Sequence, residues 1–211
     1  MINIKWFGHS MWKIWTEEIS IITDPFADIG YKVPANETAD IILSSHDHFD
    51  HNNTSIIKGD PRIFNQPGLY RQGPVDIQNI AVWHDNSKGS QRGANLLMKF
   101  KLEGFYFLHC GDLGHIPGNS ILKELGTIDV LFVPIGGFYT IDALQAKKLI
   151  DLLSPTIIFP MHYKTAVLDF PIADEKPFKK IIRNSIKISD NQICLNAADL
   201  KKPKTIFLDY A

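Results

Sequence analysis

Three histidines and two aspartates lie within six consecutive positions of this chain, residues 46–51, which read His-Asp-His-Phe-Asp-His. They directly follow residues 40–45, which read as a mostly apolar strand. His46 and His48 are two positions apart, so both can point the same way from an extended loop, while Asp50 and His51 can face a second point nearby. Imidazole nitrogens and carboxylate oxygens are ligands that zinc accepts. Because only eight histidines occur in the whole chain, this cluster predicts a metal site.

The spacing His46-x-His48-x-Asp50-His51 after an apolar strand resembles the metal signature of the metallo-β-lactamase superfamily. Five further segments resemble its small hydrolase branch, which includes the L-ascorbate-6-phosphate lactonase-like proteins, and they occur in the same order: residues 6–10, 22–26, 109–112, 134–137 and 159–163. The resemblance implies one domain over residues 1–211 with an α/β fold. The implied fold is an αββα four-layer sandwich of two mixed β-sheets packed face to face, with helices on both outer sides.

The resemblance also implies the remaining metal ligands. His84, Asp112 and His162 each follow an expected strand, as His46 does, and side chains at strand ends on one rim can converge on a rigid site. The implied ligands form two sets and a bridge, namely His46, His48 and His84; Asp50, His51 and His162; and Asp112 between them. Di-iron relatives usually have glutamate at the position of His48. The two ions are therefore expected to be zinc, with manganese, nickel and iron as alternatives.

The activity implied by this resemblance is metal-dependent hydrolysis. Hydroxide held by two metal ions would attack an ester, lactone or phosphodiester of a small, anionic substrate. The catalytic candidates are Asp50, Asp112 and His9, and the leaving group would take its proton from His9 or from water. Asp24 and His109 are expected just behind the ligands, where Asp24 would support a ligand histidine.

Two other functions stay open at this point. The first is a nucleic-acid phosphodiesterase, although a formal charge of -1 argues against a protein that grips nucleic acid through its whole surface. The superfamily's nucleases also usually carry an added substrate-binding module, for which 211 residues leave no room. The second is a non-catalytic metal- or ligand-binding module on the same fold. The full set of seven ligands favours retained chemistry.

The elements that must position these residues are mostly short strands. Hydrophobic residues make up 45% of the chain, enough for a sizeable core. Alternating or apolar runs predict strands at 2–6, 11–15, 19–22, 40–45, 62–65, 75–83, 94–102, 105–109, 129–133 and 156–159, and near 193 and 206. Helices are expected at 52–58, 142–153 and 176–184. This order favours two packed sheets with helices outside.

Cysteine usage and the N-terminus indicate where the protein works. Cys110 and Cys194 are the two cysteines, and neither belongs to a Cys-x-x-Cys pair, so free thiols in a reducing compartment are expected. The N-terminal residues lack the apolar core of a signal peptide, and no run is long enough to span a bilayer. The sequence therefore predicts a cytoplasmic protein that binds a small molecule and no membrane. Assembly into a homo-oligomer stays open.

Overall fold

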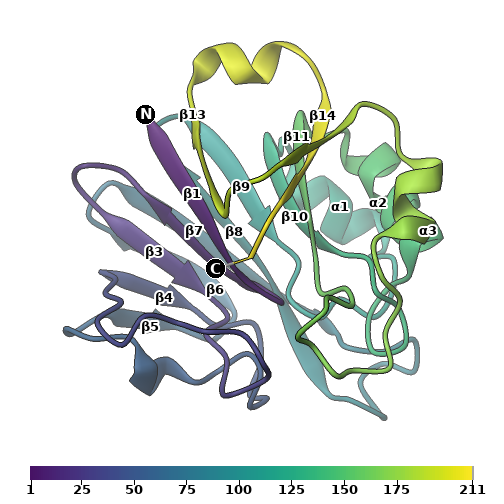
Figure 1. Ribbon diagram of the computed structural model, residues 1–211, viewed down its shortest axis with the longest axis horizontal. Coiled ribbons are helices and arrows are strands. Elements are labelled where there is room, and N and C mark those ends of the chain that lie inside the picture. Colours follow the sequence, from purple (N-terminus) through teal and green to yellow (C-terminus); the bar gives the residue numbers. More distant parts are fainter. Residues whose placement is uncertain (211) are drawn as a thin grey trace.

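Two mixed β-sheets packed face to face form the body of the molecule in the computed structural model, which describes residues 1–210 (Figure 1). The six-stranded sheet has the order β13 (Gln192–Leu195), β1 (Ile2–Gly8), β2 (Met11–Trp15), β3 (Ser20–Thr23), β4 (Ile41–Leu43) and β5 (Arg62–Phe64). The eight-stranded sheet has the order β12 (Ser185–Ile188), β14 (Lys204–Leu208), β11 (Ile157–Met161), β10 (Val130–Pro134), β9 (Phe105–His109), β8 (Ala94–Leu102), β7 (Val75–Trp83) and β6 (Gly68–Gln72).

Strand direction brings distant parts of the chain to one rim. In the first sheet β3, β4 and β5 are parallel, and β1 runs the same way as β3 because two antiparallel pairings separate them. In the second sheet β9, β10 and β11 are parallel, and β7 runs with them because β8 is antiparallel to both β7 and β9. The carboxyl ends of these strands meet at the same edge of each sheet. The residues that follow them are therefore delivered together.

Aromatic side chains join the two sheets across the core. Trp12 of β2 lies 4.8 Å from Phe132 of β10 and 5.2 Å from Phe159 of β11, measured between ring centroids. Trp6 stacks on Trp12 at 5.6 Å, and all four rings are buried. Each such ring removes a large apolar area from water, which is the main favourable contribution to folding. The strands β10 and β11 are buried along their whole length, as expected for parallel strands covered on both faces.

The two outer layers differ. The helices α1 (Asn119–Leu125), α2 (Ala143–Leu153) and α3 (Lys176–Ile181) lie on the side of the eight-stranded sheet (Figure 1). At the start of α2, Asp142 accepts a hydrogen bond from the backbone N–H of Gln145 and forms a capping box with it. On the other side, residues 26–39 and the 3₁₀ turn η1 (Thr54–Ile56) cover the sheet, with Phe26 and Tyr31 in a separate apolar cluster with Phe7. The two-sheet sandwich is thus confirmed, with loop in place of most of the second helical layer.

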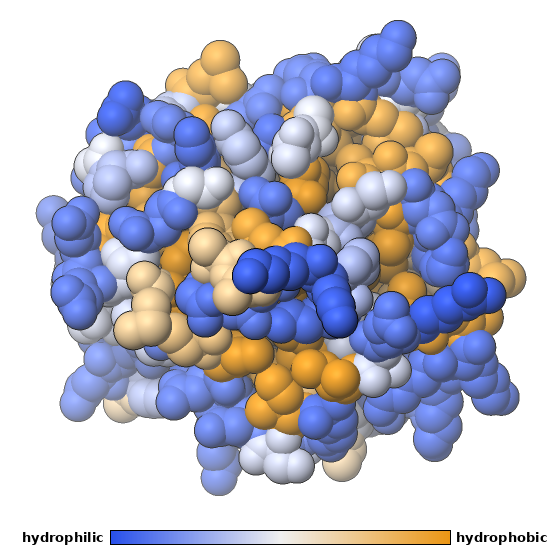
Figure 2. Space-filling model, turned by 90° about the horizontal axis from the view of Figure 1, so that it is seen from above, coloured by the Kyte–Doolittle hydropathy of each residue, from blue (hydrophilic) through white to orange (hydrophobic). Residues whose placement is uncertain are grey.

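Several elements depart from the expected bounds. The expected helix at 52–58 is only the short turn η1, and the helix that begins at Lys176 ends at Ile181. Strands β6 and β12, helix α1 and the 3₁₀ turn η2 (Ala197–Lys201) were not expected. No helix within residues 1–210 has the length and apolar character needed to cross a bilayer. Seen from above, the surface is largely hydrophilic, with apolar patches between the polar side chains (Figure 2).

Candidate metal centre

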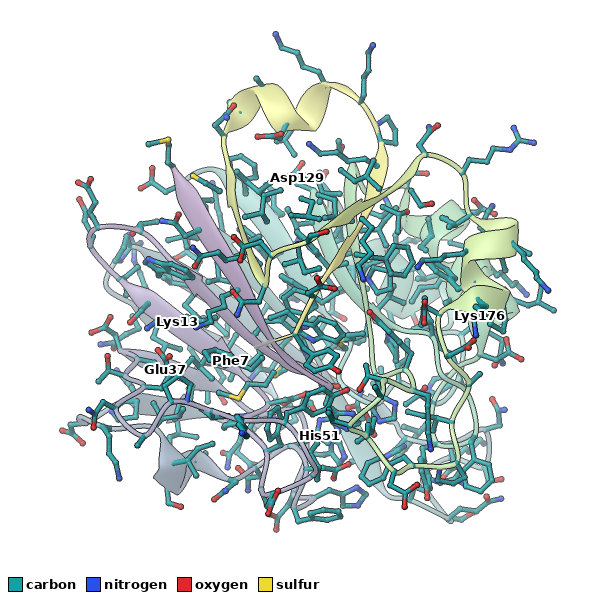
Figure 3. The ribbon with its side chains drawn as sticks, viewed as in Figure 1. Phe7, Lys13, Glu37, His51, Asp129 and Lys176 are labelled. Atoms are coloured by element: carbon teal, nitrogen blue, oxygen red, sulfur yellow. The ribbon has the colours of Figure 1, made fainter. Side chains whose placement is uncertain are left out.

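The seven expected ligands come together at the rim where the strands end, and Figure 3 shows His51 low in the molecule at this end of the sandwich. Their nitrogen and oxygen atoms fall into groups whose members all lie within 4.8 Å of one another. The groups are His46, His48 and His84; His9, Asp50, His51 and His162; and His46, His51 and Asp112. The first two match the two sets of ligands implied by the sequence resemblance, with His9 as an additional member of the second.

Asp112 lies between the two sets. Its Oδ2 atom is 3.1 Å from Nε2 of His84 in the first set and 3.2 Å from Nε2 of His162 in the second. Its Oδ1 atom is 3.2 Å from Nε2 of His51. One carboxylate that touches histidines of both sets has the position that a bridging ligand requires. Within the first set, Nε2 of His46 and Nδ1 of His48 are 3.0 Å apart.

The buried polar atoms of this centre fit a cation. Nε2 of His51, Nε2 of His162 and Oδ1 of Asp112 are buried and have no hydrogen-bond partner, although they lie close together. Burying such atoms unpaired costs free energy, and native structures rarely do so without a reason. A metal ion bound by their lone pairs would satisfy all three. Five imidazoles and two carboxylates form a donor set that suits zinc and other first-row divalent ions.

Asp24 controls the orientation of one histidine in each set. It directly follows β3, is completely buried, and accepts hydrogen bonds from the Ser45 backbone N–H (2.7 Å), from Ser45 Oγ (2.8 Å) and from Nδ1 of His51 (2.9 Å). Because Ser45 Oγ donates to Asp24, it accepts from Nδ1 of His46 at 2.9 Å. Both imidazoles therefore carry their proton on Nδ1 and present the lone pair of Nε2 to the centre.

The pKa values reflect this arrangement of charges. Burial opposes ionisation of Asp24 and Asp112, but the histidines around them outweigh it, so the pKa of each carboxyl is lowered. Burial likewise opposes protonation of His51, yet the carboxylates of Asp112 and Asp24 raise its pKa well above the usual range. Burial, followed by the charge of His51, lowers the pKa of His46 to about 3. The carboxylates thus stay negative, which favours a bound cation.

His9 is enclosed beneath the centre. Its side chain has no exposed surface, and its Nε2 atom lies 3.3 Å from Oδ2 of Asp50. The ring is 4.1 Å from that of His162 and 5.5 Å from that of Phe170, between centroids. Burial, with the charge of His162, lowers its pKa to about 4. His9 therefore contacts the centre through the carboxylate of Asp50 and through the ring of His162.

Three residues of this centre have a strained backbone conformation. His9, Asp24 and His162 all have positive φ angles, of 49°, 41° and 50°, although none is glycine. Such a conformation costs free energy and persists only where the surrounding structure enforces it. The backbone N–H of His162 donates to the carbonyl of His9 at 3.2 Å, which ties two of these residues together. The positions of the three side chains are therefore imposed by the fold.

His109 lies beside Asp24 and outside the metal groups. Its Nδ1 atom accepts a hydrogen bond from the backbone N–H of Gly111, so its Nε2 carries the proton and donates to the carbonyl of Ser10. Nδ1 is also 3.8 Å from Oδ2 of Asp24.

Cys110 is buried, and burial raises the pKa of its thiol, which makes it a poor nucleophile.

The sequence analysis missed several residues that hold the centre in place. Asn95 accepts the backbone N–H of Asp112 and donates to the carbonyl of Cys110, both at 2.8 Å. Its position at the start of an ordinary strand gave no signal. Asp85, next to His84, accepts hydrogen bonds from four backbone N–H groups of residues 87–92. Burial by itself would raise the pKa of Asp85, but these hydrogen bonds lower the pKa to about 2. The run of glycine and serine after Asp85 could have indicated such a loop.

Comparisons with known proteins agree with this arrangement. A family model described as "Beta-lactamase superfamily domain" matches residues 3–162. A UPF0173 metal-dependent hydrolase of Thermococcus onnurineus is 29% identical, over 89% of this chain and 95% of that protein. The crystal structure of a candidate Zn-dependent hydrolase of the metallo-β-lactamase superfamily from Thermotoga maritima is 34% identical, covers both chains completely and superposes with a TM-score of 0.85.

A more distant structure shows how far the fold alone can mislead. CmlA, a diiron β-hydroxylase from Streptomyces venezuelae, has a TM-score of 0.64 with only 10% identity, and the match covers 99% of this chain and 53% of that one. Proteins of this fold therefore perform different chemistry, and the function has to be inferred from the residues of the site. The family match spans most of the chain and includes the histidine-rich loop, so this protein belongs to the metallo-β-lactamase superfamily, among its metal-dependent hydrolases.

Proposed function

We propose that the protein hydrolyses an ester, lactone or phosphodiester bond of a small anionic substrate with the help of two divalent metal ions. In this proposal one ion is held by His46, His48 and His84, the other by Asp50, His51 and His162, and Asp112 lies between both. The observation that carries the proposal is the contact of Asp112 with histidines of both sets, at 3.1 to 3.2 Å. The histidine-rich donor set makes zinc our first choice of metal.

A pair of bound divalent ions supplies Lewis acidity at the scissile bond and makes a water molecule nucleophilic near neutral pH. The chain contributes the geometry. Asp24 and Ser45 hold the lone pairs of His46 and His51 toward the centre, and Asn95 fixes the backbone of Asp112. Because these groups are already oriented, they need no reorganisation when charge develops on the substrate.

We assign His9 to orienting Asp50. The Asp50 side chain is 11% exposed and that of His9 is not exposed at all, so the substrate can approach the carboxylate but not the imidazole. In this proposal the leaving group takes its proton from water in the open part of the pocket, and His9 holds the Asp50 carboxylate in place.

The test combines metal analysis with a substrate screen. The variants His48→Ala and His51→Ala are each expected to lose one of two bound metal equivalents and the hydrolytic activity, while circular dichroism shows an unchanged fold. His115→Ala is the control, because His115 accepts the backbone N–H of Trp83 and belongs to none of the metal groups. Lactones, phosphodiesters and thioesters form the screen. Full metal content and activity in His51→Ala would overturn the proposal.

The same screen addresses the two remaining alternatives. Hydrolysis of RNA or DNA with salt-dependent affinity would favour a nucleic-acid phosphodiesterase. Two tightly bound metal ions without hydrolysis of any of these substrates would favour a non-catalytic binding module. The formal charge of -1 does not favour the first alternative, and the preorganised hydrogen bonds around both metal sets do not favour the second.

A further inference from the structure

A groove of about 480 Å³ opens beside the first metal set. His46 and His48 line one part of it, and the segment from Arg92 to Leu96 lines another. The remaining lining is mainly polar and includes Asn52, Asn65 and Gln66. A pocket that adjoins a reaction centre and presents amide and charged groups is suited to the part of a substrate that is recognised but not cleaved.

Arg92 stands on a loop that is held rigidly. The carboxylate of Asp85 accepts the backbone N–H groups of Ser87 (2.6 Å), Gly89 (2.9 Å), Gln91 (3.0 Å) and Arg92 itself (2.9 Å). The loop therefore wraps around one buried acceptor, which directly follows the proposed ligand His84. This anchoring fixes the base of the Arg92 side chain relative to the metal centre.

The guanidinium of Arg92 contacts an aromatic ring. It lies over the ring of Tyr139, 5.5 Å from the centroid. The Tyr139 ring is 6.1 Å from that of Phe170, which in turn is 5.5 Å from the ring of His9. These contacts link the Arg92 side chain, through two aromatic rings, to His9 of the second group of candidate ligands. A guanidinium stacked on an aromatic ring keeps its in-plane N–H groups free to donate.

Among residues 1–210, no carboxylate lies within ion-pairing distance of Arg92. Two of the other three arginines are engaged, because Arg71 pairs with Asp76 at 3.6 Å and Arg62 donates to Gln72 at 3.0 Å, while Arg183 lines a different groove. Asp47, which also lines the groove, is engaged by Nδ2 of Asn52 at 2.9 Å. The guanidinium of Arg92 thus has free hydrogen-bond donors, and Arg92 lines the groove beside the first metal set.

The sum of the charges around the proposed metal ions favours an anion near Arg92. Two divalent ions carry four positive charges, of which the ligands Asp50 and Asp112 offset two. Arg92, which lines the groove beside the first metal set, adds a further positive charge, and an anionic group bound there would offset the repulsion between these like charges. A carboxylate or phosphate group is the anion whose planar or tetrahedral oxygens match the guanidinium donors in pairs.

We propose that Arg92 is a specificity residue that binds an oxyanion, a carboxylate or a phosphate, carried by the substrate on the arm that occupies this groove. The inference rests on the proposed function and names its substrate class: an anionic group at one end, bound by Arg92, and a hydrolysable bond at the metal sets. Arg92 recognises and orients the substrate and takes no part in breaking the bond.

The test uses the metal-loaded enzyme and matched substrates. Aryl esters with a terminal carboxylate or phosphate are compared with an ester whose terminal group is a neutral carboxamide. Arg92→Gln is expected to lower kcat/KM for the charged esters by about 10- to 100-fold, through KM, and to leave the neutral ester nearly unchanged. Arg92→Lys should recover part of the loss. Arg183→Gln is the control, because Arg183 lines a different groove, between α2 and α3.

A binding measurement separates failure of this inference from failure of the proposed function. Calorimetry with glutarate and with inorganic phosphate on the metal-loaded protein needs no turnover. Because both oxyanions also bind divalent metal ions, the loss of affinity in Arg92→Gln shows which of the two Arg92 prefers. Weaker binding in Arg92→Gln, with unchanged metal content, supports the inference even if none of the esters is cleaved. Equal affinity in the variant and the wild type, or an equal loss for charged and neutral esters, overturns it.

Discussion

Replacing Asp24 by asparagine changes one atom of the hydrogen-bond network behind the metal centre. The carboxylate accepts from the Ser45 backbone N–H, from Ser45 Oγ and from Nδ1 of His51. If the amide oxygen keeps the bond to the backbone N–H, its NH₂ group faces His51 and Ser45 Oγ. Nδ1 of His51 must then accept, and Ser45 Oγ, which now accepts from the amide, turns its own proton toward His46.

The consequence is a change of tautomer in one histidine of each metal set. With Nδ1 as the acceptor, His46 and His51 carry the proton on Nε2, the atom that must ligate. Removing the supporting partner of a ligand histidine typically weakens metal binding by about 10- to 100-fold. We therefore expect both metal affinities of Asp24→Asn to fall by about this factor, or about 1.4 to 2.7 kcal/mol for each ion.

The amide has one other orientation, and it is also unfavourable. With the oxygen toward His51, the NH₂ group meets the Ser45 backbone N–H, and a buried donor loses its partner at a cost of about 1 to 3 kcal/mol. The metal affinities would then be retained, but the free energy of unfolding would fall. Competition titrations with a chelator measure the first outcome, and urea unfolding of the metal-loaded protein measures the second.

A matched control separates this network from a general effect of losing a carboxylate. Asp40 accepts from both the backbone N–H and the hydroxyl of Ser20, at 2.8 and 2.7 Å, but it is exposed and contacts no histidine. Asp40→Asn should leave the metal affinities unchanged. If Asp24→Asn binds both ions as the wild type does and unfolds at the same urea concentration, the proposed role of Asp24 is wrong.

Three further predictions concern the core, the pH dependence and the Arg92 loop. Phe132→Ala should lower the free energy of unfolding by about 3 to 5 kcal/mol, because it opens a cavity between the sheets; urea unfolding showing a loss under 1 kcal/mol would contradict this. The pKa of His51 is raised in the metal-free protein, so the protonation of His51 contributes stability below pH 6.5, and this contribution is lost as the pH rises through the raised pKa. The melting temperature of chelator-treated protein should therefore fall over this pH range. The apparent metal affinity should rise over the same range, because metal binding displaces the proton, and a flat titration would argue against it. Asp85→Asn should accelerate amide exchange in residues 87–92 while metal content is retained, and unchanged protection would show that the carboxylate does not organise this loop.

Much of the sandwich could be predicted because its strands have local patterns. The strands at 75–83, 94–102 and 105–109 have the expected bounds, since apolar alternation or short apolar runs are properties of neighbouring residues. The same holds for Asp142 near the start of α2. Strands β6 and β12 were not predicted because they are mostly exposed or half-exposed and show little apolar alternation. Helix α1 buries only Leu125, which leaves no helical stripe to detect.

One expected helix, at 52–58, is only the short turn η1 in the structure. Asn53 precedes η1 but makes no capping hydrogen bond to it, and its Oδ1 atom accepts from Ser55 Oγ at 3.0 Å. Its Nδ2 atom donates instead to the carbonyl of Phe26, which ties the segment to the loop that covers the six-stranded sheet. The bond to Phe26 is a tertiary contact, which local helix signals do not include.

The histidine-rich motif needs only six adjacent residues, so the chain itself already indicates what kind of chemistry the centre performs. The partners that orient these ligands come from elsewhere in the chain. Asp24 and His51 are 27 positions apart, so no local periodicity relates them, and they meet only when β3 and β4 pair. The contact between Arg92 and Tyr139 likewise depends on how two loops approach across the rim. Hydrogen bonds and charges act over a few ångströms, and folding alone decides which distant residues come within that range.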